Sequence, residues 1–279
     1  MQPNTLFSEL QLISSYPFSD NHDKTLIDVG AHQGCFSLEF ALKGWQVVAF
    51  EPEKRNHQLF ANRLKDFDKV ACRLEAVSDV SGEHIPFYTS DKHYGIHSLM
   101  PFHESHELAY EVKTIRLDDA LLQLNTSTVT LLKVDIEGAD FLALRGFDFE
   151  RYRPELVMIE FMDSRSQPNF GYTHHDAVSY MRDKGYIAFV SEWAPIQEYG
   201  REGVETPPHL WLQCSPYPLD HEPSWGNLIF VPEQDRKKFE LTLARYLTEL
   251  KRSQTMGQIK ALVKKVPGVE NIYRRLIAK

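Results

Sequence analysis

The sequence predicts an α/β protein built around an open, mostly parallel sheet. From Thr25 onward, short apolar segments alternate with helical ones, an alternation that is typical of βαβ units. The segments Leu131–Val134 and Leu156–Ile159 are apolar apart from Lys133, as expected for strands that helices cover on both faces. A glycine turn at Gly30 leads directly from the first strand into a helix, which is a third indication of this class.

The chain is expected to begin with a short amphipathic helix within residues 1–24. Leu6, Leu10 and Ile13 fall on one face of this helix, and Pro17 cannot continue it. We predict that this segment precedes the sheet domain as a unit of its own.

The sheet domain is predicted to span residues 25–232. Its strands are short apolar runs, and helical segments fill the intervals between them. Near its end two strands are joined by a proline-rich link, which predicts an antiparallel edge. The expected strands are 25–29, 46–50, 70–76, 129–134, 156–161, 209–214 and 226–231, and the expected helices are 35–43, 53–65 and 140–145.

A basic helical extension, residues 233–279, is predicted to follow. A helix over 233–253 is expected first, and one or two basic helices broken at Pro267-Gly268 come after it. From Arg236 onward there are 12 Lys and Arg against 3 Asp and Glu, whereas the rest of the chain has 19 against 36. We therefore expect the body to repel nucleic acid and the extension to be able to contact a membrane surface or an acidic partner. The expected buried face of the first helix is Phe239, Leu243, Tyr246, Leu247 and Leu250.

The composition excludes several classes of protein. Hydrophobic residues make up 42% of the 279 residues and charged residues 25%, which is ordinary for a globular chain. No apolar run approaches the roughly 20 residues of a membrane-spanning helix. The first basic residue is Lys24, so we expect no signal peptide. Cys35, Cys72 and Cys214 are too few for a disulfide framework, which predicts a cytoplasmic protein.

The turn between Gly30 and Gly34 predicts a cofactor site. Gly30 permits a tight turn and the close approach of a ligand, and Gly34 lets the following helix pack nearby. The N-terminus of that helix offers unpaired N–H groups and partial positive charge. Glu51, at the end of the second strand, can accept hydrogen bonds from both hydroxyls of a ribose.

Two cofactors are compatible with this turn. NAD requires glycine at positions 32 and 35, where the chain has His32 and Cys35. An acid at Asp28 would repel a pyrophosphate and attract the ammonium and sulfonium groups of S-adenosylmethionine. The sequence thus favours S-adenosylmethionine, and an NAD-linked oxidoreductase is an alternative.

A second motif, Lys133-Val-Asp-Ile-Glu-Gly138, predicts an active site at the sheet edge. Strand periodicity places Lys133, Asp135 and Glu137 on one face, and ligands bind where parallel strands end. Buried acids and a lysine at such an edge indicate chemistry more often than a structural ion pair. The next strand ends in another acid, Glu160.

Together these motifs resemble the FkbM family of S-adenosylmethionine-dependent methyltransferases over roughly residues 25–190. The resemblance implies a class I methyltransferase (Rossmann-like) fold with a seven-stranded sheet, and often a hydroxyl acceptor on a sugar or natural product. The matching pieces are 28–34, 49–52, Asn62, 76–79, 112–119 and 133–138. The cofactor contacts it implies are Asp28, Gly30, Gly34 and Glu51. Ala31, His32, Ser78 and Asp135 are further expected cofactor contacts.

A histidine-rich loop between Ser90 and Glu111 is expected either to be a polar surface loop or to cap the site. Its four histidines could bind a metal, but glycine and proline interrupt the loop and no H-E-x-x-H helix is present, so substrate contact is favoured. A second candidate cap is the segment 163–176, which contains Arg165. The expected substrate contacts are Lys133, Glu160, His93, Ser98 and His174.

We expect methyl transfer from S-adenosylmethionine to a hydroxyl, with a saccharide as acceptor. Asp135 and His97 are candidates for the general base, and Glu137 is a third catalytic candidate that would orient the acceptor. Asp135, Glu137 and Glu160 could hold Mg²⁺, although the spacing does not require a metal. The alternative to an enzyme is a cofactor-binding protein without chemistry, docked through its basic extension.

Overall fold

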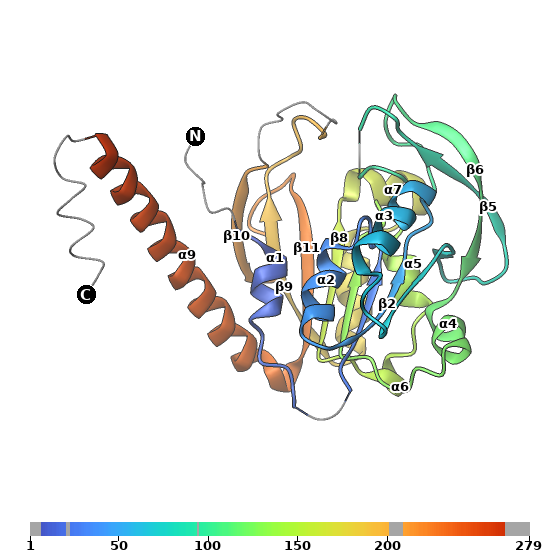
Figure 1. Ribbon diagram of the computed structural model, residues 1–279, viewed down its shortest axis with the longest axis horizontal. Coiled ribbons are helices and arrows are strands. Elements are labelled where there is room, and N and C mark those ends of the chain that lie inside the picture. Colours follow the sequence, from blue (N-terminus) through green and yellow to red (C-terminus); the bar gives the residue numbers. More distant parts are fainter. Residues whose placement is uncertain (1–6, 21–22, 94, 201–208, 266–279) are drawn as a thin grey trace. The chain divides into compact units, whose positions relative to one another are not determined.

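A computed structural model describes residues 7–20, 23–93, 95–200 and 209–265, with side chains up to Thr255 (Figure 1). The chain forms two compact units. The larger is Phe18–Arg236, and the smaller combines Met1–Pro17 with Lys237–Lys279. No helix among the described residues is both long and apolar enough to cross a membrane.

The larger unit contains an eight-stranded sheet in the order β10-β9-β11-β8-β7-β1-β2-β3. The five strands from β3 to β8 are parallel, and β11 pairs antiparallel with both β8 and β9. The α/β class with an antiparallel C-terminal edge is therefore confirmed. The strands are β1 (Thr25–Val29), β2 (Gln46–Phe50), β3 (Val70–Arg73), β7 (Leu131–Val134), β8 (Leu156–Phe161), β9 (Tyr186–Trp193), β10 (Trp211–Pro216) and β11 (Trp225–Pro232).

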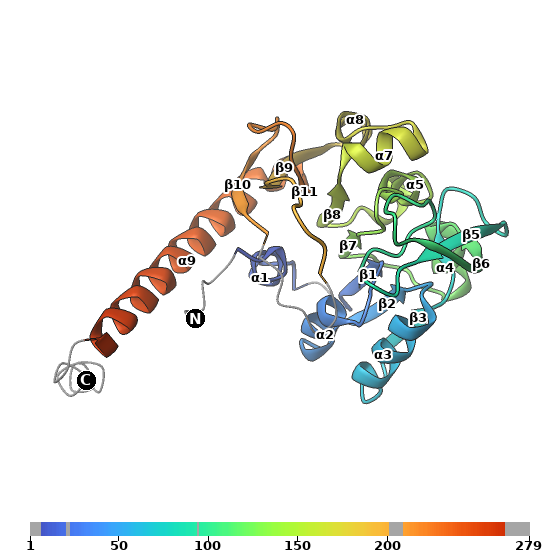
Figure 2. The ribbon, with the colours of Figure 1, turned by 90° about the horizontal axis from the view of Figure 1, so that it is seen from above.

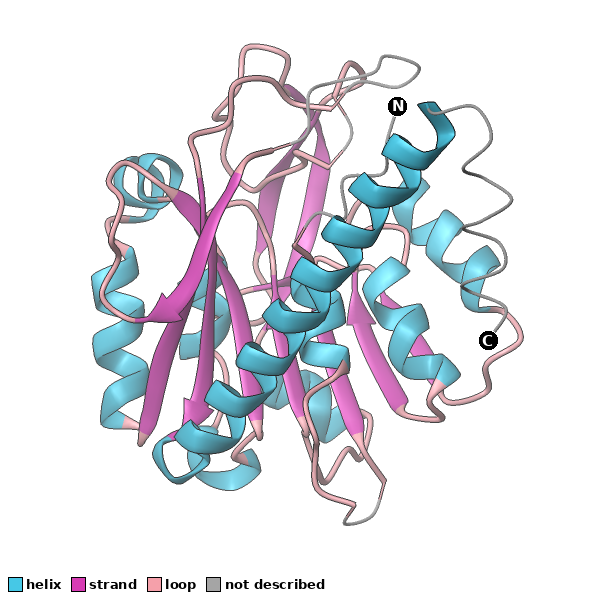
Figure 3. Ribbon diagram, turned by 90° about the vertical axis from the view of Figure 1, so that its left-hand side faces the viewer, coloured by secondary structure: helices cyan, strands magenta, loops and turns pink. Residues whose placement is uncertain are grey.

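Helices lie on both faces of this sheet (Figure 3). Strands β1, β7 and β8 are consequently buried along their whole length, which explains why their sequences are apolar apart from Thr25, Asp28, Lys133 and Glu160. The chain order reverses between β1 and β7, so their carboxyl ends form the switch point at which such sheets bind ligands. The helices are α2 (Cys35–Leu42), α3 (Lys54–Leu64), α4 (Leu117–Gln123), α5 (Asp140–Arg145), α6 (Phe149–Tyr152), α7 (Asp163–Phe170) and α8 (His174–Asp183).

A three-stranded sheet, which the sequence did not reveal, lies beyond β3 (Figure 2). It consists of β4 (Ala76–Val77), β5 (His84–Thr89) and β6 (Glu107–Ile115). The strand expected over 70–76 is wrong in its second half, because β3 ends at Arg73 and Ala76 pairs with β6 instead. The histidine-rich loop connects β5 to β6.

The antiparallel edge also differs in detail from the expectation. The strands predicted at 209–214 and 226–231 are present as β10 and β11, but they are not neighbours. Strand β9, which was not predicted, lies between them and pairs with both. The antiparallel edge therefore contains three strands, in the order β10-β9-β11.

Among its described residues the smaller unit contains α1 (Glu9–Ser14) and α9 (Arg236–Lys265), and α9 continues without a break past Ser253, where the first helix was expected to end. Helix α9 begins after a 3₁₀ turn at Glu233–Asp235. The Phe7 and Tyr246 rings meet edge to face at 5.4 Å, and the backbone N–H of Ser8 donates to the Tyr246 hydroxyl at 3.0 Å. The predicted apolar face is buried at four positions and half-buried at Leu247. Leu6 and Pro267-Gly268 lie outside the described residues.

Candidate active site

A cavity of about 330 Å³ opens at the carboxyl ends of β1, β2, β7 and β8. Its polar wall contains eight of the predicted site residues, and its apolar wall comes from β2, β4 and β5. The eight residues are Gly30, His32, Glu51, His97, Ser98, Asp135, Glu137 and Glu160, and the apolar wall includes Phe50, Pro52, Ala76, Val77 and Phe87.

The glycine turn is fixed by contacts that leave no room for side chains. Gly30 has φ +73°, and a Cβ there would lie 1.8 Å from the carbonyl oxygen of Asp135. Gly34 has φ +79°, and its Cβ would lie 2.7 Å from the side chains of Phe60 and Leu64. The turn is thus pressed against the end of β7 on one side and against α3 on the other. Ala31 is buried behind it.

Asp28 and Lys133 hold the turn from behind and do not line the cavity. The two residues are register partners on β1 and β7, and Lys133 Nζ lies 3.2 Å from Asp28 Oδ1. The ammonium donates to the Gly30 carbonyl at 2.7 Å and lies 3.5 Å from Asp135 Oδ2. Burial alone would lower the pKa of Lys133, but the charges of Asp28 and Asp135 outweigh it and raise the pKa. Lys133 therefore stays protonated. It stabilises the glycine turn and does not face the space in which an acceptor was expected.

Glu51 is buried at the floor of the cavity. One carboxylate oxygen accepts the His32 N–H at 2.7 Å, and the other accepts the Glu53 N–H at 2.9 Å. Burial raises the pKa of Glu51 to about 7, although these two hydrogen bonds lower it in part. Each oxygen keeps a lone pair that can accept a further hydrogen bond.

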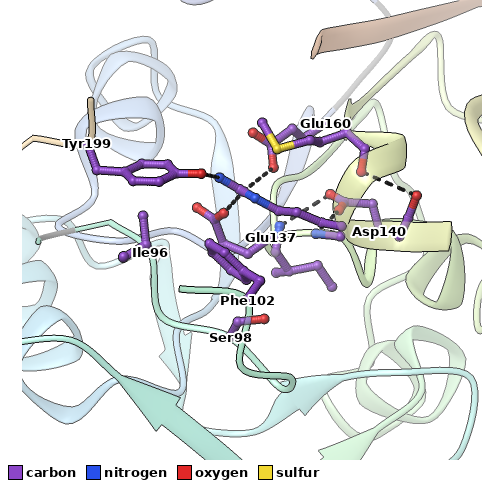
Figure 4. Close-up of polar contacts among 12 residues, drawn as sticks. Ile96, Ser98, Phe102, Glu137, Asp140, Glu160 and Tyr199 are labelled. Carbon is purple, nitrogen blue, oxygen red and sulfur yellow. Dashed lines mark hydrogen bonds and ion pairs between the residues drawn. The ribbon is translucent and has the colours of Figure 1, made fainter. Parts of the chain in front are cut away.

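Arg165, from α7, pairs with two of the acids that line the cavity, Glu137 and Glu160, which define its acidic end. Its guanidinium pairs with Glu137, lies 3.7 Å from Glu160 Oε2, and donates to the Tyr199 hydroxyl at 2.9 Å. The Phe102 ring covers it at 4.1 Å. Figure 4 shows Glu137, Glu160 and Tyr199 pointing toward one another. From the sequence, Arg165 was expected only as part of a candidate cap. Its ion pairs could not be predicted, because they depend on how α7 packs.

The acids at this end differ in their environments. Asp140 accepts the N–H groups of Ile136 and Gly138 at 3.2 and 3.1 Å, and burial followed by the charge of Asp135 raises its pKa to about 7. Burial, with the charges of Asp135 and Asp140, also raises the pKa of Glu160 well above its ordinary value. Asp135 differs from both, because its side chain is 45% exposed.

Mg²⁺ remains optional at this acidic end, where Arg165 competes with it for two carboxylates. Oxygens of Asp135, Glu137 and Glu160 lie within 4.8 Å of one another. However, the Arg165 guanidinium already supplies positive charge to Glu137 and Glu160. A cation placed among the three carboxylates would be repelled by that guanidinium, and no step below depends on one.

The histidine-rich loop contributes His97 and Ser98 to the cavity. The His97 Nδ1 accepts the Ser90 N–H at 3.4 Å, and burial lowers the pKa of His97. Ser98 pairs with Tyr88 through two backbone hydrogen bonds of 3.0 and 2.9 Å, which bring the loop back toward β5. His93 does not reach the cavity, because its Nδ1 faces the Tyr199 carbonyl at 3.3 Å.

The remaining histidines of the loop make polar contacts with oxygen atoms. His106 Nε2 lies 2.5 Å from the Ile96 carbonyl, and His103 Nδ1 lies 2.8 Å from Ser105 Oγ. Within the described part of the chain, the loop forms no cluster of three metal-ligating groups.

Two other predicted contacts also lie away from the cavity. Ser78 directs its hydroxyl to Asp79 at 3.3 Å, and its backbone N–H pairs with Ile115, because β4 has left the main sheet. His174 is buried against Asp163 at the start of α8. Neither residue lines the cavity that Asp135 and Glu51 share.

Known proteins provide an independent view of this site. The sequence profile described as the methyltransferase FkbM domain matches residues 28–188. A protein named Methyltransferase 1, from Beauveria bassiana (strain ARSEF 2860), is 28% identical over 206 residues, which are 64% of this chain and 78% of that protein.

Solved methyltransferase structures are more distant. A precorrin-6y C5,15-methyltransferase from Geobacter metallireducens is 13% identical and has a TM-score of 0.39. The match covers 79% of this chain and 86% of that one. A magnesium protoporphyrin IX methyltransferase from Synechocystis, with bound SAM, is 10% identical and has a TM-score of 0.34. The match covers 75% of this chain and 69% of that one. The assignment rests on the family match, which includes the glycine turn, Glu51 and Asp135. The chain belongs to the FkbM family of S-adenosylmethionine-dependent methyltransferases.

Proposed function

We propose that the protein transfers the methyl group of S-adenosylmethionine to a hydroxyl group of a saccharide. The observation that carries the proposal is the half-exposed Asp135 carboxylate, which lines the cavity directly beside the glycine turn. His97, Ser98 and Glu160 line the same cavity. This polar wall suits an acceptor that carries several hydroxyls.

In this proposal the donor extends along the cavity from the glycine turn to the second sheet. Gly30 and His32 hold its methionine part, and Glu51 accepts hydrogen bonds from its ribose hydroxyls. The adenine lies against the apolar wall that includes Ala76 and Phe87. The acceptor then approaches from the acidic end.

Asp135 is the general base of the proposed reaction. His97 is less suited, because its Nδ1 accepts the Ser90 N–H and its proton therefore stays on Nε2, from which it donates to the acceptor oxygen. Glu137 is held by Arg165 and positions the acceptor. As the acceptor oxygen attacks the methyl carbon in line, the sulfonium leaves as a neutral thioether and the hydroxyl proton passes to Asp135.

The test is methyl transfer from S-adenosylmethionine with a ¹³C-labelled methyl group to a panel of mono- and oligosaccharides. A labelled O-methyl signal in the NMR spectrum of a saccharide product is expected. Amine-bearing acceptors form the second arm of the panel. Labelled N-methyl products from that arm, with none from the saccharides, would overturn the proposed acceptor class.

The affinity for S-adenosylhomocysteine is expected to fall as the pH is lowered from 8 to 6. Since the pKa of Glu51 is about 7, protonation over this range removes an acceptor for the ribose hydroxyls. Calorimetric titration at several pH values measures the effect. The Glu51→Gln variant should bind more weakly at pH 8 and show a flatter profile. Equal pH dependence in both proteins would assign the effect to another group.

We also infer that the basic extension contacts anionic membrane surfaces. Arg245, Lys251 and Arg252 are exposed on α9, and each basic residue near such a surface contributes about 1 kcal/mol of attraction. The protein should co-sediment with phosphatidylserine vesicles and not with phosphatidylcholine vesicles. Replacing all three residues by glutamate should abolish this binding, and unchanged sedimentation would contradict the inference.

We place the reaction in the cytoplasm. Cys35, Cys72 and Cys214 all lie in the described part of the chain and are present as thiols. Thiols of this kind persist in a reducing compartment.

A further inference from the structure

A group of metal-ligating side chains lies outside the cavity. His174 and His175 begin α8, and Glu222 belongs to the segment between β10 and β11. One ring nitrogen of each histidine and one carboxylate oxygen of Glu222 lie within 4.8 Å of one another. None of the three residues lines the cavity described above.

His174 is the anchor of this group. Its side chain is 5% exposed, and its Nδ1 lies 2.7 Å from Asp163 Oδ2. Because a carboxylate accepts this hydrogen bond, the proton of the neutral ring resides on Nδ1. The other nitrogen, Nε2, is buried and has no hydrogen-bond partner among the described residues. Leaving a buried polar atom without a partner is unfavourable, and a bound ligand would remove that cost.

His175 and Glu222 provide the exposed side of the group. The His175 Nδ1 contacts the Tyr217 hydroxyl, and its ring centroid lies 4.0 Å from that of His174. Each imidazole thus has an oxygen partner on Nδ1, which leaves Nε2 for coordination. This arrangement is usual for metal-binding histidines.

The surroundings carry negative charge. The Asp163 carboxylate lies 2.7 Å from His174 Nδ1, and Glu222 places a second carboxylate within the group itself. Two carboxylates therefore act on the space in which the histidines meet. A cation bound there would be attracted by both of them.

We propose that His174, His175 and Glu222 bind a divalent transition-metal ion, with Zn²⁺ as the probe. Two imidazoles and one carboxylate suit Zn²⁺ and leave a fourth position for water, whereas Mg²⁺ and Ca²⁺ prefer oxygen ligands alone. Atoms that share a zinc ion at about 2.1 Å lie roughly 3.4 Å apart. Small rotations of the exposed His175 and Glu222 side chains can complete the set.

The ion would connect two parts of the larger unit that are distant in sequence. It would join the start of α8 to the link between β10 and β11, while Asp163 fixes the orientation of His174. The expected consequence is greater thermal stability in the presence of Zn²⁺.

The test is titration of the metal-free, full-length protein with Zn²⁺ against a chromophoric chelator. One ion should bind per chain. His175→Ala and Glu222→Gln should each weaken binding at least tenfold, and Asp163→Asn about 10–100-fold. The matched controls His84→Ala and Glu233→Gln replace exposed residues outside the group and should bind as the unmodified protein does.

Melting temperatures in EDTA check that the variants fold, and the exposed positions of His175 and Glu222 favour this. Zn²⁺ should raise the melting temperature of the unmodified protein and not that of His175→Ala. Absence of stoichiometric binding would overturn the proposal. Equal binding by the His175→Ala and Glu222→Gln variants would do so as well, since the ion would then lie elsewhere.

Discussion

Replacement of Asp135 by asparagine is expected to slow methyl transfer by about 10²–10⁴-fold, the range ascribed to a general base. Asparagine has nearly the same shape, but it cannot take the proton of the acceptor hydroxyl. The buried Lys133 ammonium, 3.5 Å from Asp135 Oδ2, keeps its contact with the turn through the Gly30 carbonyl. Binding of the donor should therefore change little.

The rate is measured as formation of S-adenosylhomocysteine, and donor binding by calorimetry. Asp66→Asn, an exposed change of the same kind, is the matched control and should leave both unchanged. His97→Gln should cost much less than Asp135→Asn, because His97 only orients the acceptor. A reversed order of the two effects would make His97 the base.

Gly30→Ala is expected to destabilise the protein by more than about 4 kcal/mol and to abolish donor binding. Two effects combine at this position. The left-handed backbone, with φ +73°, costs roughly 1–2 kcal/mol for any residue with a Cβ. The new methyl group would also lie 1.8 Å from the Asp135 carbonyl oxygen, so β1 and β7 would have to separate at their ends.

Gly44→Ala separates the two effects. Gly44 has φ +78°, but no atom lies within 4 Å of the Cβ position. Only the backbone cost of about 1–2 kcal/mol should therefore remain, with normal donor binding. Urea unfolding gives both free energies. If the two substitutions cost the same, the contact between Gly30 and the end of β7 would not matter for stability.

Local sequence patterns predicted the central part of this fold well. The strands that became β1, β2 and β8 have the bounds expected from their apolar runs, since both faces of the sheet are covered. The ends of β2 and β7 also placed Glu51 and Asp135 at the cavity.

Features that depend on long-range pairing were not predictable in this way. Lys133 was expected to contact the acceptor, but its register partner on β1 is Asp28, which draws the ammonium behind the turn. Ser78 was expected at the cofactor together with the family motifs, but β4 pairs with β6 and places Ser78 away from the cavity. Arg165 gave no local signal, since the partners that define it come from three separate segments.

The cavity has two halves with different origins. The half proposed to hold the donor is made by strand ends and by the glycine turn, whose Gly30 carbonyl accepts a hydrogen bond from the buried Lys133. On the proposed acceptor side, by contrast, His97 and Ser98 belong to the loop that connects β5 to β6. Exchanging that loop between members of the family would thus redirect the enzyme to new acceptors without disturbing how it handles its methyl donor.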